Sequence, residues 1–278
     1  MTDKKVYNTG ENEKDLREKY NYDGSVLRKA QLRMVEMLSF LDKICNENDI
    51  KYFIAFGTLL GAVRHGGFIP WDDDMDIYID AKGLKKLRNI INNGEYPYVV
   101  QDYTIDKGFV KYFNVLRDLK SEYVKNEFVH NQRKYHGIQI DLFPYEYGVF
   151  EFGKKIVAIT MGFNEKCLLG KYKTLSGLLF NITRNAIIPF LKFLSYFKGK
   201  KYVSLGYEGV SPGYKYLSCD VFPLKQMKFE GLTVKCPNNS EAILCVDYGE
   251  SYNNIPEEID RNHHKVLDIR FFDNISIR

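Results

Sequence analysis

Four aspartates lie within five residues of one segment, which reads Trp-Asp-Asp-Asp-Met-Asp over positions 71–76. Carboxylates packed this closely repel one another unless a cation neutralises them. If the segment is extended, Asp74 and Asp76 point to one face with Cα atoms about 6.5 to 7 Å apart. Oxygen ligands of this kind suit Mg²⁺, which completes its shell with water or substrate phosphates. The pattern predicts a divalent-metal site for phosphoryl chemistry.

Two other interpretations of these acids are a calcium-binding loop and a solvated acidic loop. The spacing of Asp72, Asp74 and Asp76 fits the first ligand positions of an EF-hand. However, Ile77 and Gly83 stand where that loop requires Gly and Glu. Apolar residues flank the acids on both sides, which is not typical of a solvated loop.

A third carboxylate is expected from another strand, and Asp141 is the best candidate. It is the lone charge in the run Ile-Gln-Ile-Asp-Leu-Phe. An unpaired carboxylate in apolar surroundings is costly, and a metal ion would remove that cost. A buried basic partner would do the same, so both interpretations stay open.

Candidate phosphate-binding groups lie upstream of the acids. Gly57-Thr58 follows a strand-like run and opens a helix, where backbone N–H groups and the helix dipole can hold a phosphate. Arg64 could grip a diphosphate in bidentate fashion, or satisfy the end of its helix. His65 is adjacent. Arg117 is a second candidate phosphate contact, or part of a surface ion pair with the aspartate that follows it.

The elements that must position these residues can be read from periodicity. Apolar residues at helical spacing predict a helix over 25–47, and β-branched and aromatic residues predict a short strand over 52–56. Thr58 is expected to cap a helix over 59–64 that Gly66-Gly67 ends. Alternation predicts a strand over 71–80, followed by a helix over 81–92. Further elements are expected as strands at 96–103, 109–116, 122–129 and 137–143, helices within 152–202, a hairpin at 229–234 and a helix at 241–248.

Composition describes a folded chain and excludes several classes. The chain has 278 residues, of which 45% are hydrophobic and 27% charged, so it is not disordered. A net charge of +4 is too mild to indicate nucleic acid as a partner. Five cysteines without a Cys-x-x-Cys pair argue against a disulfide framework or a zinc ribbon. The charged first twenty residues predict no signal peptide, and polar residues interrupt the apolar stretch 175–197, so a cytoplasmic location is expected.

The ordered motifs resemble the LicD family of phosphocholine-type transferases, with the fukutin group as a more distant relative. The resemblance is carried by Gly57-Thr58, by the block from Leu60 to Arg64, by Gly66-Gly67-Phe68-Ile69-Pro70-Trp71-Asp72-Asp73-Asp74-Met75-Asp76 and by Ile140-Asp141-Leu142-Phe143-Pro144. Weaker likeness extends through Phe229-Glu230-Gly231-Leu232 and Tyr248-Gly249-Glu250-Ser251-Tyr252. The family often has a basic residue two positions before the arginine that matches Arg117, where this chain has Val115.

The resemblance implies an α/β (α+β) fold with a nucleotidyltransferase-type mixed sheet, flanking helices and a helical insertion. It implies that Gly57 and Thr58 form the phosphate turn and that Asp74, Asp76 and Asp141 hold Mg²⁺, with Mn²⁺ as the alternative ion. The domain arrangement expected is a tail over 1–22, a catalytic core over 23–150, an insertion over 151–202 and the rest of the core over 203–278.

The implied reaction is transfer of a phospho-alcohol from a CDP-alcohol to a hydroxyl of a cell-surface glycan or its lipid-linked oligosaccharide precursor. Trp71 and tyrosines could cage a choline head group. Basic and aromatic residues over 171–201 could contact the inner face of the plasma membrane, or form an ordinary buried helical hairpin. The alternatives are a nucleotidyltransferase that uses a nucleoside triphosphate, an Asp-x-Asp glycosyltransferase and a non-enzymatic scaffold.

Overall fold

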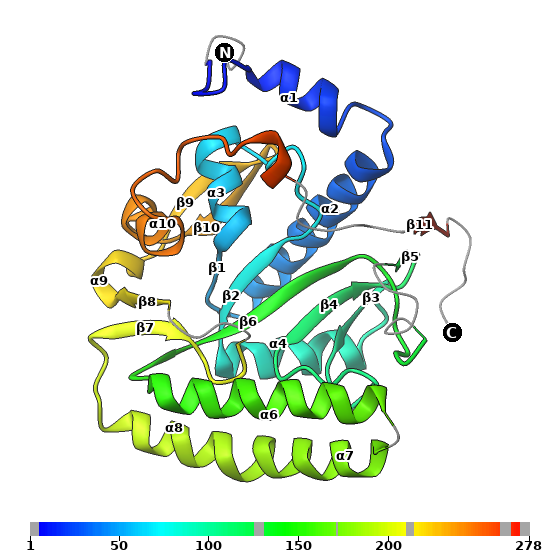
Figure 1. Ribbon diagram of the computed structural model, residues 1–278, viewed down its shortest axis with the longest axis vertical. Coiled ribbons are helices and arrows are strands. Elements are labelled where there is room, and N and C mark those ends of the chain that lie inside the picture. The colour runs from blue at the N-terminus through cyan, green and yellow to red at the C-terminus, as the bar shows by residue number, and fades with distance from the viewer. Residues whose placement is uncertain (1–5, 125–130, 171, 210–213, 262–267, 273–278) are drawn as a thin grey trace.

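The computed structural model describes residues 6–124, 131–170, 172–209, 214–261 and 268–272 (Figure 1). Its helical elements are α1 (Glu13–Tyr20), α2 (Val26–Glu47), α3 (Phe56–His65), α4 (Ala81–Asn93), α6 (Glu151–Leu169), α7 (Lys173–Ile182), the π-helical turn η1 (Thr183–Ile187), α8 (Ile188–Tyr196), α9 (Ser218–Val221), α10 (Ser240–Tyr248) and the 3₁₀ turn η2 (Glu258–Asp260). Its strands are β1 (Tyr52–Ile54), β2 (Asp76–Asp80), β3 (Tyr98–Gln101), β4 (Asn114–Asp118), β5 (Ser121–Val124), β6 (Gln139–Tyr147), β7 (Tyr202–Leu205), β8 (Lys215–Leu217), β9 (Lys225–Phe229), β10 (Leu232–Cys236) and β11 (Asp268–Phe271).

A mixed sheet forms the centre of the molecule. Within the described residues it has seven strands, in the order β1-β2-β6-β4-β3, with β7 added to the end of β6 and β8 added to β7. The β2–β6 pair is parallel, and the other neighbouring strands in the sheet are antiparallel. Two small antiparallel pairs, β9–β10 and β5–β11, stand apart from it. The mixed α/β architecture of the α+β class is therefore confirmed.

The register of the parallel pair separates the two faces of the sheet. Asp76 lies beside Asp141, and the next pair along the strands is Ile77 beside Leu142. Because successive side chains alternate, the acids share one face while the fully buried Ile77 and Leu142 point to the other. Helix α4 contacts β2, β3 and β6, and its Leu87 is fully buried in the main core.

Local signals placed most boundaries correctly. Helix α2 begins after Ser25, whose Oγ accepts a hydrogen bond from the Arg28 N–H at 3.1 Å. Helix α3 ends at Gly66, which has φ +70° and satisfies the last carbonyls, as a left-handed C-cap does. The hairpin around Glu230 is confirmed as β9–β10. Helix α10 is confirmed, with Asn239 as its N-cap.

Three boundary predictions are wrong. The strand expected at 109–116 begins at Asn114 and ends at Asp118. Strand β2 begins at Asp76 rather than at residue 71, so the first three acids lie on an irregular loop. Helix α3 begins at Phe56, and its N-cap is Ala55, so Thr58 is inside the helix rather than before it. The Thr58 hydroxyl accepts a hydrogen bond from the Asp76 N–H at 2.8 Å. Thr58 therefore joins the phosphate-turn segment to the start of the acidic strand.

Part of the segment predicted as a tail, residues 1–22, is folded and anchored to the core. Helix α1 carries a capping box in which Asn12 and Asp15 satisfy each other's backbone N–H groups. Leu16 is fully buried in the main core. The Glu13 carboxylate reaches the His65 ring at the end of α3. This helix therefore supports the elements around the acids.

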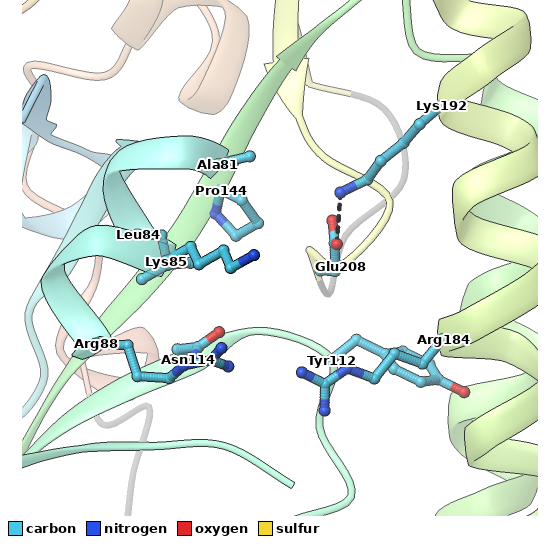
Figure 2. Close-up of a pocket in the computed structure, with 10 residues that line it drawn as sticks. All are labelled: Ala81, Leu84, Lys85, Arg88, Tyr112, Asn114, Pro144, Arg184, Lys192 and Glu208. Atoms are coloured by element: carbon cyan, nitrogen blue, oxygen red, sulfur yellow. Dashed lines mark hydrogen bonds and ion pairs between the residues drawn. The ribbon is translucent and has the colours of Figure 1, made fainter. Parts of the chain in front are cut away.

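Residues 151–196 form helices α6, α7, η1 and α8, which pack beside the sheet (Figure 1). Side chains of these helices and of the loops around the sheet pack together in a second hydrophobic core. Its buried residues are Tyr103, Val110, Tyr112, Val157, Met161, Phe180, Ile188, Leu191 and Tyr207. A pocket of about 190 Å³ lies between these helices and α4. Figure 2 shows Arg184 and Lys192 extending across it from the helices toward Lys85 and Arg88 of α4.

Ion pairs hold the inner side of these helices to the core. The Asp102 carboxylate forms ion pairs with Arg88 of α4 and with Arg184 of η1. The Lys192 ammonium lies 2.6 Å from a carboxylate oxygen of Glu146 and 2.6 Å from one of Glu208. No helix in the described part of the chain is long and apolar enough to cross a membrane.

Candidate active site

A pocket of about 460 Å³ opens where α3, the acidic loop and the segment after α10 meet. It brings together five of the residues that the sequence analysis selected, namely Gly57, Arg64, Trp71, Asp74 and Asp76. The remaining lining residues are Phe56, Leu60, Ile69, Asp72, Tyr248, Ser251, Tyr252, Asn254, Pro256 and Asp260. Residues far apart in the sequence therefore form one cavity around the acids.

The acids keep the predicted alternation although the strand starts late. Asp72, Asp74 and Asp76 are partly exposed and line the pocket, whereas Asp73 and Met75 are buried. Burial and the neighbouring charges of Asp74 and Asp73 raise the pKa of Asp72 well above its usual range. One carboxylate oxygen from each of Asp72, Asp73 and Asp74 lies within 4.8 Å of the other two. Such crowding of oxygen ligands fits a divalent cation.

The acidic loop is held in place from outside the pocket. The Tyr123 hydroxyl on β5 donates a hydrogen bond to the Asp73 carboxylate. The Gln31 side chain on α2 donates to the Asp72 backbone carbonyl at 2.9 Å. These contacts fix the backbone, so that Asp72 and Asp74 face the pocket.

Asp141 lies in β6 at the register position beside Asp76. Its backbone N–H donates to the Met75 carbonyl at 2.8 Å, and its carboxylate accepts a hydrogen bond from the Gln139 amide. Among the described residues it does not line the pocket itself. The fold nevertheless sets it on the same face of the sheet as Asp76, as the metal prediction requires.

Gly57 and Phe56 open helix α3 at the edge of the pocket. A Cβ atom on Gly57 would lie 2.8 Å from a carboxylate oxygen of Asp72, so a side chain here would displace that acid. Phe56 has φ +44°, which is strained for a bulky residue and is frequent at functional sites. Thr58 is buried and bonds to the backbone of β2, so its role is to position the loop.

Arg64 lines the pocket, but much of its guanidinium is already engaged. Its Nη1 donates to the backbone carbonyls of Tyr252 at 3.1 Å and Asn254 at 2.9 Å. Burial lowers the pKa of Arg64 to about 10, although the negative charge of nearby acidic groups, including Asp72, acts to raise it. Arg64 therefore places a positive charge beside the acids and holds the C-terminal segment over them.

His65 lies behind Arg64 and outside the pocket. Its Nε2 accepts from the Arg64 Nε at 2.9 Å, which leaves the proton on Nδ1. The Nδ1 atom lies 2.6 Å from a Glu13 carboxylate oxygen. The structure therefore makes His65 a support for Arg64 rather than a direct substrate contact.

Arg117 also lies away from the pocket. It is buried on β4, where its Nε donates to Gln101 at 2.7 Å and its Nη1 to the Gly137 carbonyl at 2.7 Å. Burial and then the charge of Arg133 lower the pKa of Arg117 to about 9, while the charge of Asp141 opposes this. Arg117 lies opposite Gln139 on β6, two positions from Asp141, which favours an electrostatic role behind the acids over a phosphate contact.

The sequence analysis placed Glu230 in a hairpin and in a segment of weaker family likeness, and the structure shows that it clamps the turn before the acids. Its carboxylate binds Arg28 through two bonds of 3.1 and 2.7 Å and accepts from the Phe68 N–H at 3.1 Å. A Cβ atom on Gly67 would lie 2.3 Å from Glu230, which explains why glycine stands there.

The pocket residues after α10 were the least predictable part of the site. Tyr248 and Tyr252 belong to a segment whose only signal was its likeness to the family's C-terminal pattern. Trp71 contacts the Tyr20 ring at 5.3 Å between centroids, and the Arg261 guanidinium lies 5.2 Å from the Trp71 ring centre. The Trp71 ring is therefore partly covered already.

Comparisons with known proteins match the part of the chain that contains the acidic loop. Residues 49–168 match the family described as LicD/FKTN/FKRP, nucleotidyltransferase domain. A lipopolysaccharide cholinephosphotransferase of Haemophilus influenzae, LicD, is 47% identical over 53 residues, which are 19% of this chain and 20% of that protein. An uncharacterized protein of Rickettsia prowazekii is 45% identical over 73 residues, or 26% of each chain.

The ribitol 5-phosphate transferase FKRP of Mus musculus is 30% identical over 131 residues, which are 45% of this chain and 23% of that protein. The chain thus matches only about a fifth to a quarter of the length of these relatives. In this chain the matched family domain, residues 49–168, contains the acidic loop.

Proposed function

Because residues 49–168 match the family described as LicD/FKTN/FKRP, nucleotidyltransferase domain, we propose that this chain transfers a phospho-alcohol from a CDP-alcohol to a hydroxyl of a cell-surface glycan or its lipid-linked precursor. The observation that carries the proposal is the pocket in which Asp72, Asp74 and Asp76 face Gly57 and Arg64. The names of two relatives support the class of group transferred, since they specify cholinephosphate and ribitol 5-phosphate. The donor nucleotide and the acceptor are part of the proposal.

Asp74 and Asp76, with Asp141 beside them, are the proposed ligands of Mg²⁺, with Mn²⁺ as the alternative. A bound divalent ion would neutralise charge on the donor diphosphate and on the leaving CMP. The crowded carboxylates of Asp72, Asp73 and Asp74, a group that shares only Asp74 with this ligand set, support a cation at the loop, because like charges this close disfavour ionisation without one.

In the proposed reaction, the acceptor hydroxyl oxygen bonds to the phosphorus that carries the alcohol, and the bond from that phosphorus to CMP breaks. Asp141, or an acid of the loop that is not bound to the metal, takes the hydroxyl proton or orients the hydroxyl. Arg64 offers positive charge at the wall of the pocket, where the diphosphate would lie. Thr58 keeps the helix terminus against the acidic strand.

The reaction class can be tested by ³¹P NMR of the purified protein with Mg²⁺. CDP-choline, CDP-ribitol, CDP-glycerol, a nucleoside triphosphate and a UDP-sugar are compared as donors, each with and without EDTA. Release of CMP from a CDP-alcohol, stopped by EDTA, is the expected result. Pyrophosphate released from the triphosphate would instead identify a nucleotidyltransferase, and UDP released from the sugar nucleotide would identify a glycosyltransferase.

A further inference from the structure

Helix α6 has an apolar stripe on its solvent side as well as on its buried side. Val157 and Met161 are buried in the second core cluster. On the opposite side, four large apolar residues recur at intervals of four, three and four positions, and all are exposed: Phe152, Ile156, Ile159 and Phe163. A helix with two apolar faces in water normally has a partner on each.

The following helical segment repeats this pattern over a greater length. Its exposed large apolar side chains are Leu175, Leu178, Ile182, Phe190, Phe193 and Tyr196. Among residues 174–197, every exposed side chain is uncharged. Of the twenty exposed large apolar side chains in the described part of the chain, twelve lie between residues 152 and 197. The exposed apolar surface is therefore concentrated on these helices.

The charged side chains of this segment face the protein, whereas those of an ordinary soluble helix face the solvent. Arg184 and Lys192 are its two charged residues between 174 and 197, and both turn inward to acids of the core (Figure 2). Those ion pairs hold the inner face to the protein, while the outer face is left apolar. This inverted polarity is expected of a surface that meets a non-aqueous phase.

The charge of the helical segment indicates which kind of partner could cover its apolar face. Residues 151–201, from the start of α6, hold ten lysines and arginines but two acids, Glu151 and Glu165, whereas the whole chain has a net charge of only +4. Exposed lysines border the apolar stripes at Lys155 and Lys166 and, after α8, at Lys198, Lys200 and Lys201. A second copy of the chain would bring two such basic surfaces together, but an anionic bilayer would neutralise them.

We propose that α6, α7 and α8 dock on the surface of an anionic membrane, with their outer apolar side chains in the headgroup–acyl boundary and the flanking lysines on lipid phosphates. The helices would lie along the interface, since none of the described helices can cross it. This surface is built from other residues than the acidic pocket and stands independently of the proposed reaction.

The test is flotation of the purified protein with vesicles, made either of equal parts phosphatidylglycerol and phosphatidylcholine or of phosphatidylcholine alone. Binding to the anionic vesicles that weakens with added salt is expected. The double variant Phe190→Asp/Phe193→Asp should bind roughly tenfold or more weakly, because both side chains are more than half exposed and lose their apolar contact with lipid. Leu32→Asp, on an exposed apolar residue of α2, should bind as the wild type does.

Thermal unfolding by circular dichroism verifies that each variant is folded, and light scattering reports the oligomeric state. Absence of binding to anionic vesicles, or binding that the double variant retains, would overturn the proposal. A dimer that dissociates on the same double substitution would overturn it as well, because a second copy would then cover this face.

Discussion

Asp76 and Asp141 are direct neighbours on the parallel strands β2 and β6, although 65 positions separate them in the sequence. The Asp141 N–H donates to the carbonyl of Met75, so the pairing begins immediately before Asp76. A shift of one residue would turn one of the two carboxylates to the opposite, apolar face. The register of this strand pair is thus the structural condition for the proposed metal site.

Replacing Asp74 or Asp76 with Asn should abolish turnover while leaving the fold intact. Each substitution keeps the size of the side chain but removes a negative charge from the pocket wall. CMP release followed by ³¹P NMR, together with thermal unfolding, measures both properties. Asp23→Asn, on an exposed residue outside this pocket, should keep full activity. Turnover like that of the wild type in either site variant would refute the assignment.

Gly57→Ala should lower activity by about tenfold or more with little loss of stability. The new Cβ would lie 2.8 Å from the Asp72 carboxylate and push it out of the pocket, which costs catalytic geometry rather than core packing. Gly162→Ala is the matched control, since nothing lies within 4 Å of the new methyl group in helix α6. That control should gain about 0.5 to 1 kcal/mol of stability from helix propensity. Equal activity in both variants would show that Asp72 is dispensable.

Glu230→Gln should reduce the free energy of unfolding by about 3 kcal/mol. The substitution removes the negative charge from a buried ion pair and leaves the Arg28 guanidinium buried without a counter-charge. Burial raises the pKa of Glu230, but Arg28, the Phe68 N–H and Arg17 together bring it below its ordinary value of 4.5. A lowered pKa means that this stabilisation is present above pH 4.5 and is lost as the pH falls through the lower folded value.

Urea unfolding at pH 7 and at pH 3 measures this effect, and the difference between wild type and Glu230→Gln should shrink at the lower pH. The exposed pair between Lys14 and Glu18 provides the control, since Glu18→Gln should change stability by less than about 0.5 kcal/mol. A Glu230→Gln protein as stable as the wild type at pH 7 would rule out the clamp.

Asp247→Asn should stabilise the protein at pH 8 more than at pH 5. Burial raises the pKa of Asp247 from 3.8 to about 7, against a hydrogen bond from the Tyr216 hydroxyl. Between these two pKa values Asp247 is protonated in the folded state but ionised in the unfolded state. The free energy of unfolding therefore falls as the pH rises, and the full loss is reached above pH 7. Thermal unfolding from pH 5 to pH 8 in metal-free buffer measures this slope, which the variant should flatten. An unchanged slope would contradict the prediction.

The sequence alone determined the local features of this protein. Periodicity located α2, α4 and α10, and glycine at Gly66 gave the end of α3, because these signals arise from contacts within a few residues. Alternation of side chains gave the shared orientation of Asp72, Asp74 and Asp76. The same local chemistry predicted an acidic site, and the family resemblance implied the mixed α/β class.

Only the tertiary structure decided which candidate residues line the pocket and which hold other residues in place. His65 and Arg117 looked like ligand contacts, but their partners Glu13 and Gln101 come from other elements, and no local pattern reveals them. Tyr252 enters the pocket because Arg64 bonds to its carbonyl across 188 positions of sequence. Residue type and spacing thus set the chemistry that this chain offers. Long-range packing decides which charges remain available to a ligand, because each buried polar group must first satisfy its own hydrogen bonds.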